Sequence, residues 1–266
     1  MRFFLIASIL LLSACAPNPF AKFYYDNTGG ADLKALSAPP KSSVVEPTLI
    51  RGGDFESKTL AMREEGYDLI GHSRFNAAKI DESQALEQGK AVGAEVVVLH
   101  SEYTETLSGS LPLSLPNTQT QTTNLSGNVF GSGGSGSYSG TATTQTTGTQ
   151  TTYIPYNVRR YDYTATFWVK GKEPVFGVKI RDLKEEERQL IESNKGVVVV
   201  VVVKGSPAFN ADVLRGDIIR QIGEIEIIDR STLPKVVEKY AGKGVDVLLL
   251  RNGEKISKHI TLNLRK

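Results

Sequence analysis

The sequence predicts an α+β protein in which a small α/β sandwich domain, interrupted by a polar tract, precedes a second domain made mostly of short strands. Three patterns support this prediction. A strand–helix–strand pattern lies between residues 56 and 103, a charge-free tract runs from Thr106 to Val158, and strand signals separated by turns run from Val175 to the end of the 266-residue chain. The 31 basic and 29 acidic side chains nearly cancel, so we expect no nucleic-acid partner.

The first 14 residues have the features of a secretory signal. Met1-Arg2 is a short basic start, and the apolar run from Phe3 to Leu12 is about half as long as a membrane-spanning helix. It ends in Leu12-Ser13-Ala14-Cys15, which resembles the lipobox of bacterial lipoproteins. The resemblance implies cleavage after residue 14 and acylation of Cys15, with palmitate among the acyl chains. Because Ala16 rather than Asp follows, it also implies the outer membrane, on its periplasmic or surface face. The alternative is a plain secretory peptide.

Residues 15–55 are expected to form a lipidated tether that holds the folded part away from the membrane. Prolines and two Gly-Gly pairs break regular structure throughout this segment. Tyr24-Tyr25 can still attach part of it to a domain. The helix-breaking residues are Pro17, Pro19, Pro39, Pro40, Pro47, Gly29-Gly30 and Gly52-Gly53.

Residues 56–172 are expected to form the α/β domain, with a low-complexity insertion at 106–152. Gly66 to Phe75 predicts a strand, and Asp81-Glu82-Ser83 predicts the start of a helix that Gly93 ends. The four apolar residues from Val96 to Leu99 leave no polar face, which indicates a buried strand. Tyr161 to Val169 alternates aromatic and polar residues and predicts the strand that returns after the insertion.

The insertion allows two interpretations. Of its 47 residues, 33 are Ser, Thr, Gly or Gln, a composition that buries too little apolar surface to fold alone and therefore favours a disordered loop. The alternative rests on symmetry, because Thr/Gln runs at 118–123 and 143–152 flank a Gly-rich centre at 131–140. Thr favours strands and Gly favours a turn, so the flanking strands can continue outward as a long hairpin, completed by neighbouring copies in a homo-oligomer.

The last hundred residues carry a regular series of strands, turns and helices. Glu-rich Leu183 to Ser193 predicts a helix, and the seven valines from Val197 to Val203 predict a strand that is covered on both faces. Leu233 and Val237 lie four residues apart on a predicted helix with Pro234 in its first turn. A final hairpin is predicted around the turn Arg251-Asn252-Gly253-Glu254.

In this order, the motifs of residues 173–266 resemble a PDZ domain of the type found in the envelope proteases of the high-temperature-requirement family. The resemblance covers about a third of the chain and implies a short β-barrel or sandwich with two helices, without a protease domain. Asp212 stands where the family usually has Gly, and Gly223-Glu224 replaces a usual Asn-Gly or Asp-Gly turn. The matching segments are Phe176-Gly177-Val178, Asp182 to Arg188, Gly205-Ser206-Pro207-Ala208 and Leu214-Arg215-Gly216-Asp217-Ile218-Ile219.

A peptide-binding groove is what this resemblance implies for the site. A ligand tail would add as a strand beside Val178 to Ile180, while backbone amides around Gly177 hold its terminal carboxylate. The helix would supply the opposite wall, although apolar residues at this spacing are equally typical of a core. Lys172 and Arg181 are the basic residues nearest to the loop. The residues implied are Phe176, Gly177, Val178, Lys179, Ile180, Leu233, Val237 and Tyr240.

Enzymatic and metal-binding functions are not expected. A Ser-His-Asp protease needs a separate domain of roughly 200 residues, and that length does not remain once the tether, insertion and C-terminal domain are subtracted. His72 and His100 both adjoin Ser, a weak hint of catalysis, and His259 lies in an alternating strand. Glu185-Glu186-Glu187 point in different directions around a helix and make no metal site. We therefore expect no cofactor and no metal.

Two hypotheses of function follow. The first is a non-catalytic, membrane-anchored lipoprotein whose PDZ module binds C-terminal or extended peptides of envelope proteins, as an adaptor or sensor. The alternative is a structural or surface-assembly lipoprotein whose Thr/Gly-rich tract forms intersubunit contacts. The two differ in which part of the chain meets a partner.

Overall fold

The computed structural model describes residues 17–33, 37–38 and 46–265. Cys15 and the rest of the lipobox lie outside these residues. The chain divides into two compact units, one formed by residues 103–160 and the other by the remainder. Among the described helices, none has the length and apolar character needed to cross a membrane.

The first sheet has five strands in the order β1-β3-β5-β4-β2. Three of them lie within the predicted α/β domain, and two come from the segment predicted as a tether. Residues of β1 pair antiparallel with β3, with Tyr24 opposite Ser73, and residues of β2 pair parallel with β4, with Thr48 opposite Val96. The strands are β1 (Tyr24–Asp26), β2 (Thr48–Arg51), β3 (Tyr67–Ala78), β4 (Val96–Gly131) and β5 (Gly134–Lys170).

The tether prediction is therefore wrong for these two segments, which form the edges of the first sheet. Tyr24-Tyr25 attaches the chain to the sheet, as the alternative within that prediction held. Helix α1 (Pro19–Lys22) begins at the cap residue Asn18 and places the fully buried ring of Phe20 5.0 Å from the ring of Phe75. A segment that contributes a buried aromatic ring to a core is part of the domain.

Alternating residues of the central strands fill both sides of the first sheet. Val97 and Leu99 belong to one apolar cluster with Phe167, whereas Val96 and Val98 belong to another with Trp168. This is the burial on both faces that an unbroken apolar run predicts. Helices α3 (Phe55–Glu64) and α4 (Ser83–Ala91) belong to this part of the chain, and Gly93, with φ +72°, follows the cap residue Val92 at the end of α4, as predicted.

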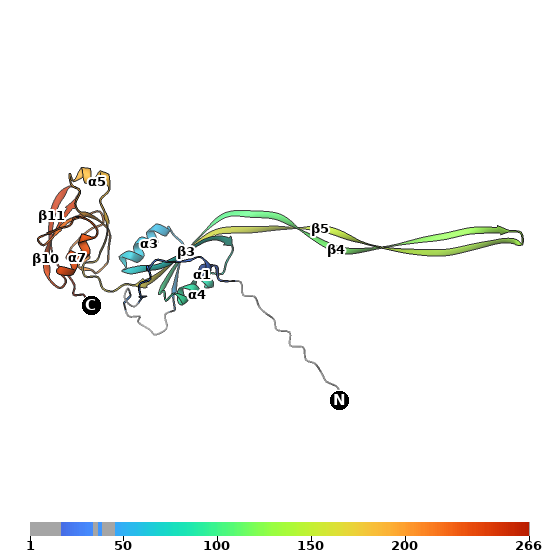
Figure 1. Ribbon diagram of the computed structural model, residues 1–266, viewed down its shortest axis with the longest axis horizontal. Helices are drawn as coiled ribbons and strands as arrows, with labels where there is room; N and C mark the ends of the chain where they lie inside the picture. Colours follow the sequence, from blue (N-terminus) through green and yellow to red (C-terminus); the bar gives the residue numbers. More distant parts are fainter. Residues whose placement is uncertain (1–16, 34–36, 39–45, 266) are drawn as a thin grey trace, which may run out of the picture. The chain divides into compact units, whose positions relative to one another are not determined.

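The insertion is ordered as a hairpin, so the disordered-loop prediction is wrong and the hairpin part of the alternative is confirmed, while its completion by neighbouring copies stays a prediction. β4 and β5 run on from the sheet as a long twisted ribbon that turns at its glycine-rich end (Figure 1). Side-chain hydrogen bonds join Ser108 to Asn157, Ser114 to Thr151, and Thr141 to Asn124. Between these pairs, a move of a given number of residues forward along β4 matches a move of the same number of residues backward along β5. The pairing register is therefore constant along the ribbon.

The C-terminal sheet is open, in the order β11-β10-β8-β7-β6, with β9 paired to β8. It is therefore not a closed barrel, which corrects the barrel half of the expected architecture, while the α+β class is confirmed. Its elements are β6 (Val178–Asp182), α5 (Glu185–Leu190), β7 (Val197–Val202), α6 (Pro207–Asn210), β8 (Ile218–Ile222), β9 (Ile225–Glu226), α7 (Thr232–Lys239), β10 (Gly244–Arg251) and β11 (Glu254–Thr261).

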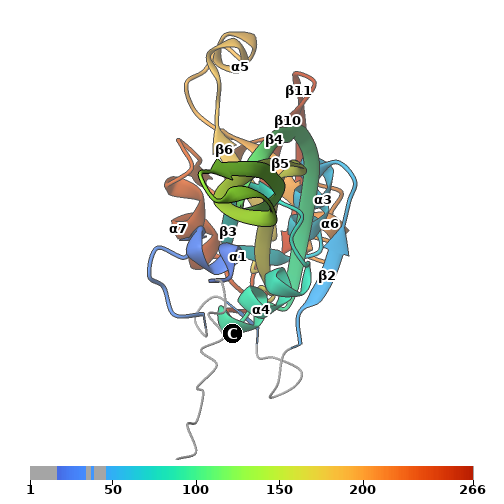
Figure 2. The same ribbon diagram turned by 90° about the vertical axis from the view of Figure 1, so that its right-hand side faces the viewer.

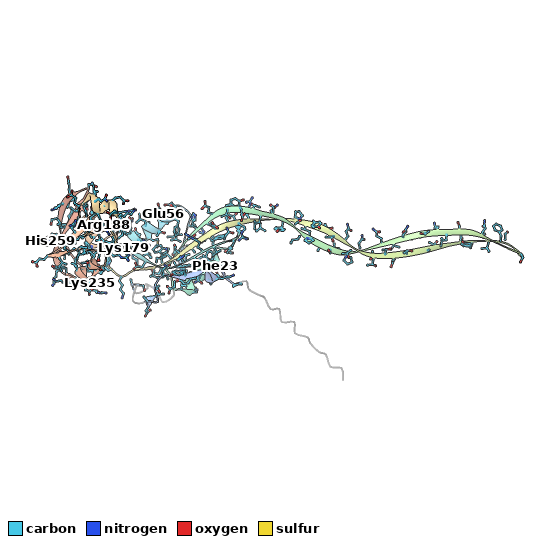
Figure 3. All side chains as sticks on the ribbon, turned by 45° about the horizontal axis from the view of Figure 1, so that its top comes forward. Phe23, Glu56, Lys179, Arg188, Lys235 and His259 are labelled. Carbon is cyan, nitrogen blue, oxygen red and sulfur yellow. The ribbon has the colours of Figure 1, made fainter. Side chains whose placement is uncertain are left out.

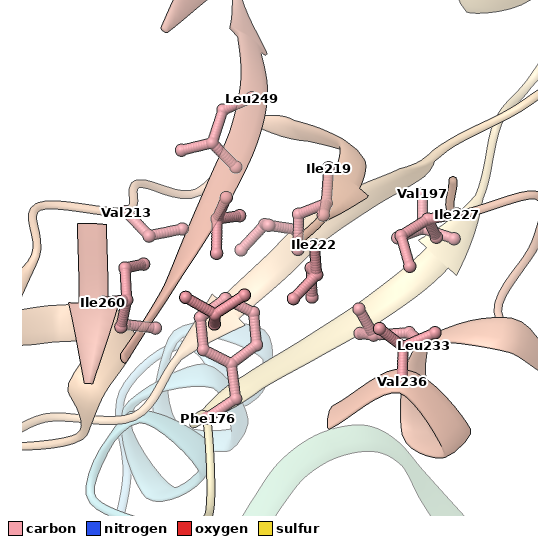
Figure 4. Packing of buried hydrophobic residues seen from close by; sticks show 14 of the residues in the cluster. Phe176, Val197, Val213, Ile219, Ile222, Ile227, Leu233, Val236, Leu249 and Ile260 are labelled. Carbon is pink, nitrogen blue, oxygen red and sulfur yellow. The ribbon is translucent and has the colours of Figure 1, made fainter. Parts of the chain in front are cut away.

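One apolar cluster holds this sheet and its helix α7 together. Figure 4 shows Leu233 and Val236 projecting from α7 on one side of the cluster, and Phe176 lying among the strand residues that include Ile222 and Ile260. All five are at most 5% exposed. By contrast α5 stands out on its own from the sheet, carried by its flanking loops (Figure 2). The core therefore fixes α7, which forms a wall of the cleft described below.

Two unusual residues of the motifs have structural roles. Asp212 has φ +54°, which confirms that it replaces Gly in a left-handed position, a conformation that Asp tolerates. Asp217 is 1% exposed, and its carboxylate accepts bonds of 2.8 and 2.9 Å from the guanidinium of Arg251 and one of 2.8 Å from the amide of Leu214. Asp217, the second residue of the Gly-Asp pair, therefore joins the turn at Leu214 to Arg251 of strand β10.

Candidate functional site

A cleft of about 610 Å³ lies along strand β6 and helix α7. It brings together seven of the eight residues that the sequence implied for a groove. These are Phe176, Gly177, Val178, Lys179, Ile180, Leu233 and Val237. The cleft therefore has a sheet edge on one side and a helix on the other.

Tyr240, the eighth residue, does not line the cleft. It caps the C-terminal end of α7, and its hydroxyl accepts a 3.5 Å bond from the amide of Glu224. A Cβ on Gly223 would lie 2.4 Å from the same oxygen, so the Gly223-Glu224 turn is fitted around this ring. Tyr240 lies one turn further along the helix, so its side chain lies beyond the end of the groove. The prediction that Tyr240 forms part of the wall is therefore wrong.

The loop before β6 can be built only with glycine at position 177. Its φ is +94°, a conformation that other residues rarely adopt, and a Cβ there would lie 2.1 Å from Cβ of Ser206. Phe176 precedes it and is 3% exposed, so its ring lies in the core cluster and supports the loop from beneath. The Phe176 side chain therefore belongs to the core, and the backbone of the loop borders the cleft.

Hydrogen bonds orient the amides of this loop. The carbonyl of Phe176 accepts a 2.9 Å bond from the amide of Ala208, and the carbonyl of Gly177 accepts a 2.8 Å bond from the amide of Val203. In a trans peptide the N–H points opposite to the C=O of the same unit. The N–H groups of Gly177 and Val178 therefore point away from residues 203–208. Two adjacent amides with this orientation can donate hydrogen bonds to an anion.

Strand β6 is at the end of the sheet and pairs with β7 on one side, with Val178 opposite Val202. The other side faces the cleft and presents backbone groups to which an extended segment can bond. Opposite this edge, α7 contributes Leu233, which is 5% exposed, and the half-buried Val237. Leu233 belongs to the core cluster and Val237 packs against it, so both side chains contribute to the core as well as to the wall of the cleft.

Ion pairs occupy several of the charges around the cleft. Lys179 Nζ lies 2.9 Å from Asp68 Oδ1, and the Arg230 side chain lies 3.5 Å from Asp182. Arg181, one of the basic residues near the loop in sequence, instead donates two 2.6 Å bonds to Glu187. These bonds lower the pKa of Glu187 to about 2. Arg181 therefore fixes α5 and does not serve the loop.

The structure adds residues to the cleft beyond the eight that the resemblance implied for the groove, and one of them is Lys172, a basic residue near the loop in sequence. Some come from the end of α3 and the start of β3, more than a hundred residues before β6, and some from the connection between the two domains. The others come from the end of β7 and from around the start of α7. No local pattern signals such a contact. The added residues are Arg63, Gly66, Tyr67, Asp68, Gly171, Lys172, Pro174, Val175, Val203, Arg230, Ser231 and Pro234.

None of the three histidines lines the cleft. His72 Nδ1 lies 2.8 Å from the amide oxygen of Asn27, His259 Nδ1 lies 2.8 Å from Asp246, and the ring of His100 lies 6.5 Å from the ring of Phe55. Within the described part of the chain, no group of three or more His, Cys, Asp or Glu is placed to hold a metal.

Comparison with known proteins gives a family for the C-terminal part. Residues 174–262 match the model of the PDZ domain. Similar solved structures are an HtrA-type protease AlgW with a decapeptide (28% identity over 35% of this chain and 30% of that chain, TM-score 0.31) and the HtrA3 PDZ domain bound to the phage-derived ligand FGRWV (20% identity over 34% and 85%, TM-score 0.30). This chain thus spans less than a third of that AlgW chain. Comparison with curated protein sequences gave no match. Residues 174–262 are therefore a PDZ domain, and the match covers that part of the chain.

Proposed function

We propose that this protein is a lipid-anchored, non-catalytic adaptor or sensor whose PDZ domain binds C-terminal or extended peptides of other envelope proteins. The observation that carries the proposal is the open edge of β6 beside a loop whose Gly177 and Val178 amides point away from the core. A peptide strand can pair with this edge while its carboxylate accepts bonds from the amides. The match of residues 174–262 to the PDZ domain supports this mode, because PDZ domains bind peptides as an added strand.

The lipobox at residues 12–15 supports the anchoring part of the proposal. Acylation of Cys15 would hold the chain at the outer membrane, and the alanine that follows favours that membrane over the inner one. Replacing Cys15 by Ala is expected to release the protein from the membrane fraction. Membrane retention of the Cys15→Ala protein after a salt wash would contradict lipid anchoring.

A pull-down with a library of C-terminal peptides tests the binding claim. The wild-type protein is expected to enrich a subset of peptides, and Gly177→Trp is expected to lose that enrichment because its side chain fills the loop. Gly216→Trp is the matched control, since Gly216 has φ +95° but no atom within 4 Å of the position that a Cβ would take, and lies outside the cleft. Val237→Lys blocks the opposite wall without disturbing the loop. Equal enrichment in all four proteins would remove the claim.

The hairpin supports a second candidate function, assembly through the insertion. Gly109 faces Tyr156 and Gly127 faces Tyr138, so odd-numbered residues of β4 share a face of the ribbon with even-numbered residues of β5. Nine exposed apolar side chains between residues 106 and 158 lie on this one face, whereas Phe130 and Tyr153 lie on the other. The nine are Leu107, Leu111, Leu113, Leu115, Leu125, Val129, Tyr138, Ile154 and Tyr156.

A second copy of the hairpin is the partner that this face fits. Side chains stand out along the whole ribbon (Figure 3), and the tract from 106 to 158 carries no charge that could repel an identical ribbon. An isolated two-stranded hairpin is marginally stable in water, and the edges of this one carry none of the charges that block pairing. Packing of this apolar face against the same face of a second copy would bury the apolar side chains of both hairpins.

The mass of the assembly, measured by light scattering on the full chain in detergent, tests this candidate. We expect more copies per assembly for the wild type than for a chain without residues 106–152, and loss of assembly when Leu111, Leu113 and Leu115 are all replaced by Ser. Replacing Phe130 and Tyr153 by Ser is the control, because these exposed apolar side chains lie on the opposite face. The same number of copies per assembly in all four proteins would exclude assembly through the hairpin.

A further inference from the structure

We infer that the first domain completes the carboxylate end of the PDZ groove, with Arg63 and Lys172 supplying the positive charge that attracts a peptide with a free C-terminal carboxylate. The inference rests on the proposed peptide binding and adds to it the residues outside the groove strand and helix that select the ligand. Both side chains line the cleft, Arg63 from the last turn of α3 and Lys172 from the connection before β6.

Hydrogen bonds place the end of α3 beside the loop around Gly177. The amide of Lys204 donates a 2.8 Å bond to the carbonyl of Glu64, and the amide of the preceding residue, Val203, donates a 2.8 Å bond to Gly177. Residues 203–204 thus bond to Glu64, the neighbour of Arg63, through one amide and to the loop around Gly177 through the other. The ammonium of Lys204 also lies 2.5 Å from the Glu65 carboxylate, and this hydrogen bond lowers the pKa of Glu65.

The connection between the domains is held to the same turn. The amide of Gly171 donates a 2.9 Å bond to the carbonyl of Gly66, and a Cβ on Gly66 would lie 3.2 Å from the side chain of Val203. Lys172 follows Gly171 directly. The turn after α3, the connection and the loop around Gly177 are therefore linked by bonded backbone, and both cations lie on that linked structure.

Charge distinguishes these two cations from the others around the cleft. Lys179 is paired with Asp68 and Arg230 with Asp182. Arg63 and Lys172 form no ion pair with the described residues, and both side chains are exposed. Among the described residues that line the cleft, Asp68 is the one acidic side chain and is already paired, so the lining has an excess of positive charge. An anionic group bonded to the Gly177 and Val178 amides would neutralise it.

A library of random peptides with free C-termini, and the same library with C-terminal amides, tests the inference on the full chain. Wild-type protein is expected to enrich the free acids over the amides. Arg63→Gln and Lys172→Gln are each expected to weaken capture of the enriched peptides about fivefold, and the effect should shrink in high salt. Arg63→Lys should restore binding, because it keeps the charge. Arg74→Gln, on the exposed part of β3 and outside the cleft, is the matched control.

The outcomes separate this inference from the proposed function. Enrichment of free acids and amides alike, or enrichment that Arg63→Gln and Lys172→Gln leave unchanged, would overturn the role of these cations while leaving peptide binding intact. No enrichment from either library would remove the proposed function and this inference together. Weaker capture by both variants, with rescue by Arg63→Lys, would support it.

Discussion

Gly177 shows how one residue type decides whether the loop can exist. Two constraints act on it, a positive φ and the Ser206 side chain that occupies the space of a Cβ. The first raises the energy of any other residue and the second demands movement of the neighbouring turn. The loop around Gly177 therefore depends on the absence of a side chain more than on the presence of any.

Replacing Gly177 by Ala separates these two constraints. Gly216 has nearly the same φ, +95° against +94°, but open space at its Cβ position. We expect Gly216→Ala to lower the free energy of unfolding by about 1 kcal/mol from backbone strain alone, and Gly177→Ala by about 1–3 kcal/mol more. Denaturant unfolding of both variants measures the difference. Equal losses would show that Ser206 gives way freely.

Asp217 makes a second prediction at this scale. Its buried carboxylate is held by Arg251 and by the Leu214 amide, so removing it leaves the guanidinium and the amide without their partner. Asp217→Ala is expected to lower the free energy of unfolding by about 3 kcal/mol. The control is Asp246→Ala, because Asp246 is exposed and pairs with His259 at the surface, where we expect a loss of at most about 0.5 kcal/mol. Similar losses for both would contradict the structural role of the motif.

At the scale of elements, α5 is the least supported helix of the PDZ domain. It has no buried residue, and it is held by the carboxylate of Glu187, which accepts two bonds from Arg181 and one of 2.8 Å from the amide of Lys184. Polar contacts rather than apolar packing therefore attach it to β6. Its stability should depend on the charge of Glu187.

The pH dependence of α5 follows from the lowered pKa of Glu187. Its pKa is about 2 in the folded protein against 4.5 for the free side chain, so its contribution to stability is present above pH 4.5 and is lost as the pH falls toward 2. Amide hydrogen exchange of residues 185–190 should show protection in the wild type that decreases over this range. Glu187→Gln should lack that pH dependence, and an identical pH profile for both proteins would refute the assignment.

At the scale of the whole molecule, local patterns in the sequence predicted the elements, whereas distant contacts were hidden. The valine run and the ordered motifs predicted the PDZ domain because each reflects the residue's own strand or turn. The pairing of Asp217 with Arg251, and the position of Arg63 beside the groove, join residues far apart in the chain. The prolines and glycines around residues 48–51 predict a tether, whereas these residues form a strand whose partner begins at Val96.

The same limits explain the errors in the candidate site. The PDZ resemblance implied Leu233 and Val237, which helical spacing puts on one face, but it also extended the wall wrongly to Tyr240. Composition indicates whether a segment can fold alone, and for the insertion it favours disorder. The insertion does not fold alone, because its two strands are continuations of β4 and β5 of the first sheet. Register then sorted its few apolar residues onto one face, which composition alone does not reveal.

Peptide titration of the amides at the groove tests the central claim most directly. With the isotopically labelled full chain and the peptide most enriched from the free-acid library, the amide protons of Gly177 and Val178 should show the largest downfield shifts, followed by those along β6. The C-terminal amide of the same peptide should shift them much less. Binding that leaves Gly177 and Val178 unshifted, or shifts that appear only outside β6 and α7, would contradict recognition of a peptide carboxylate in this groove.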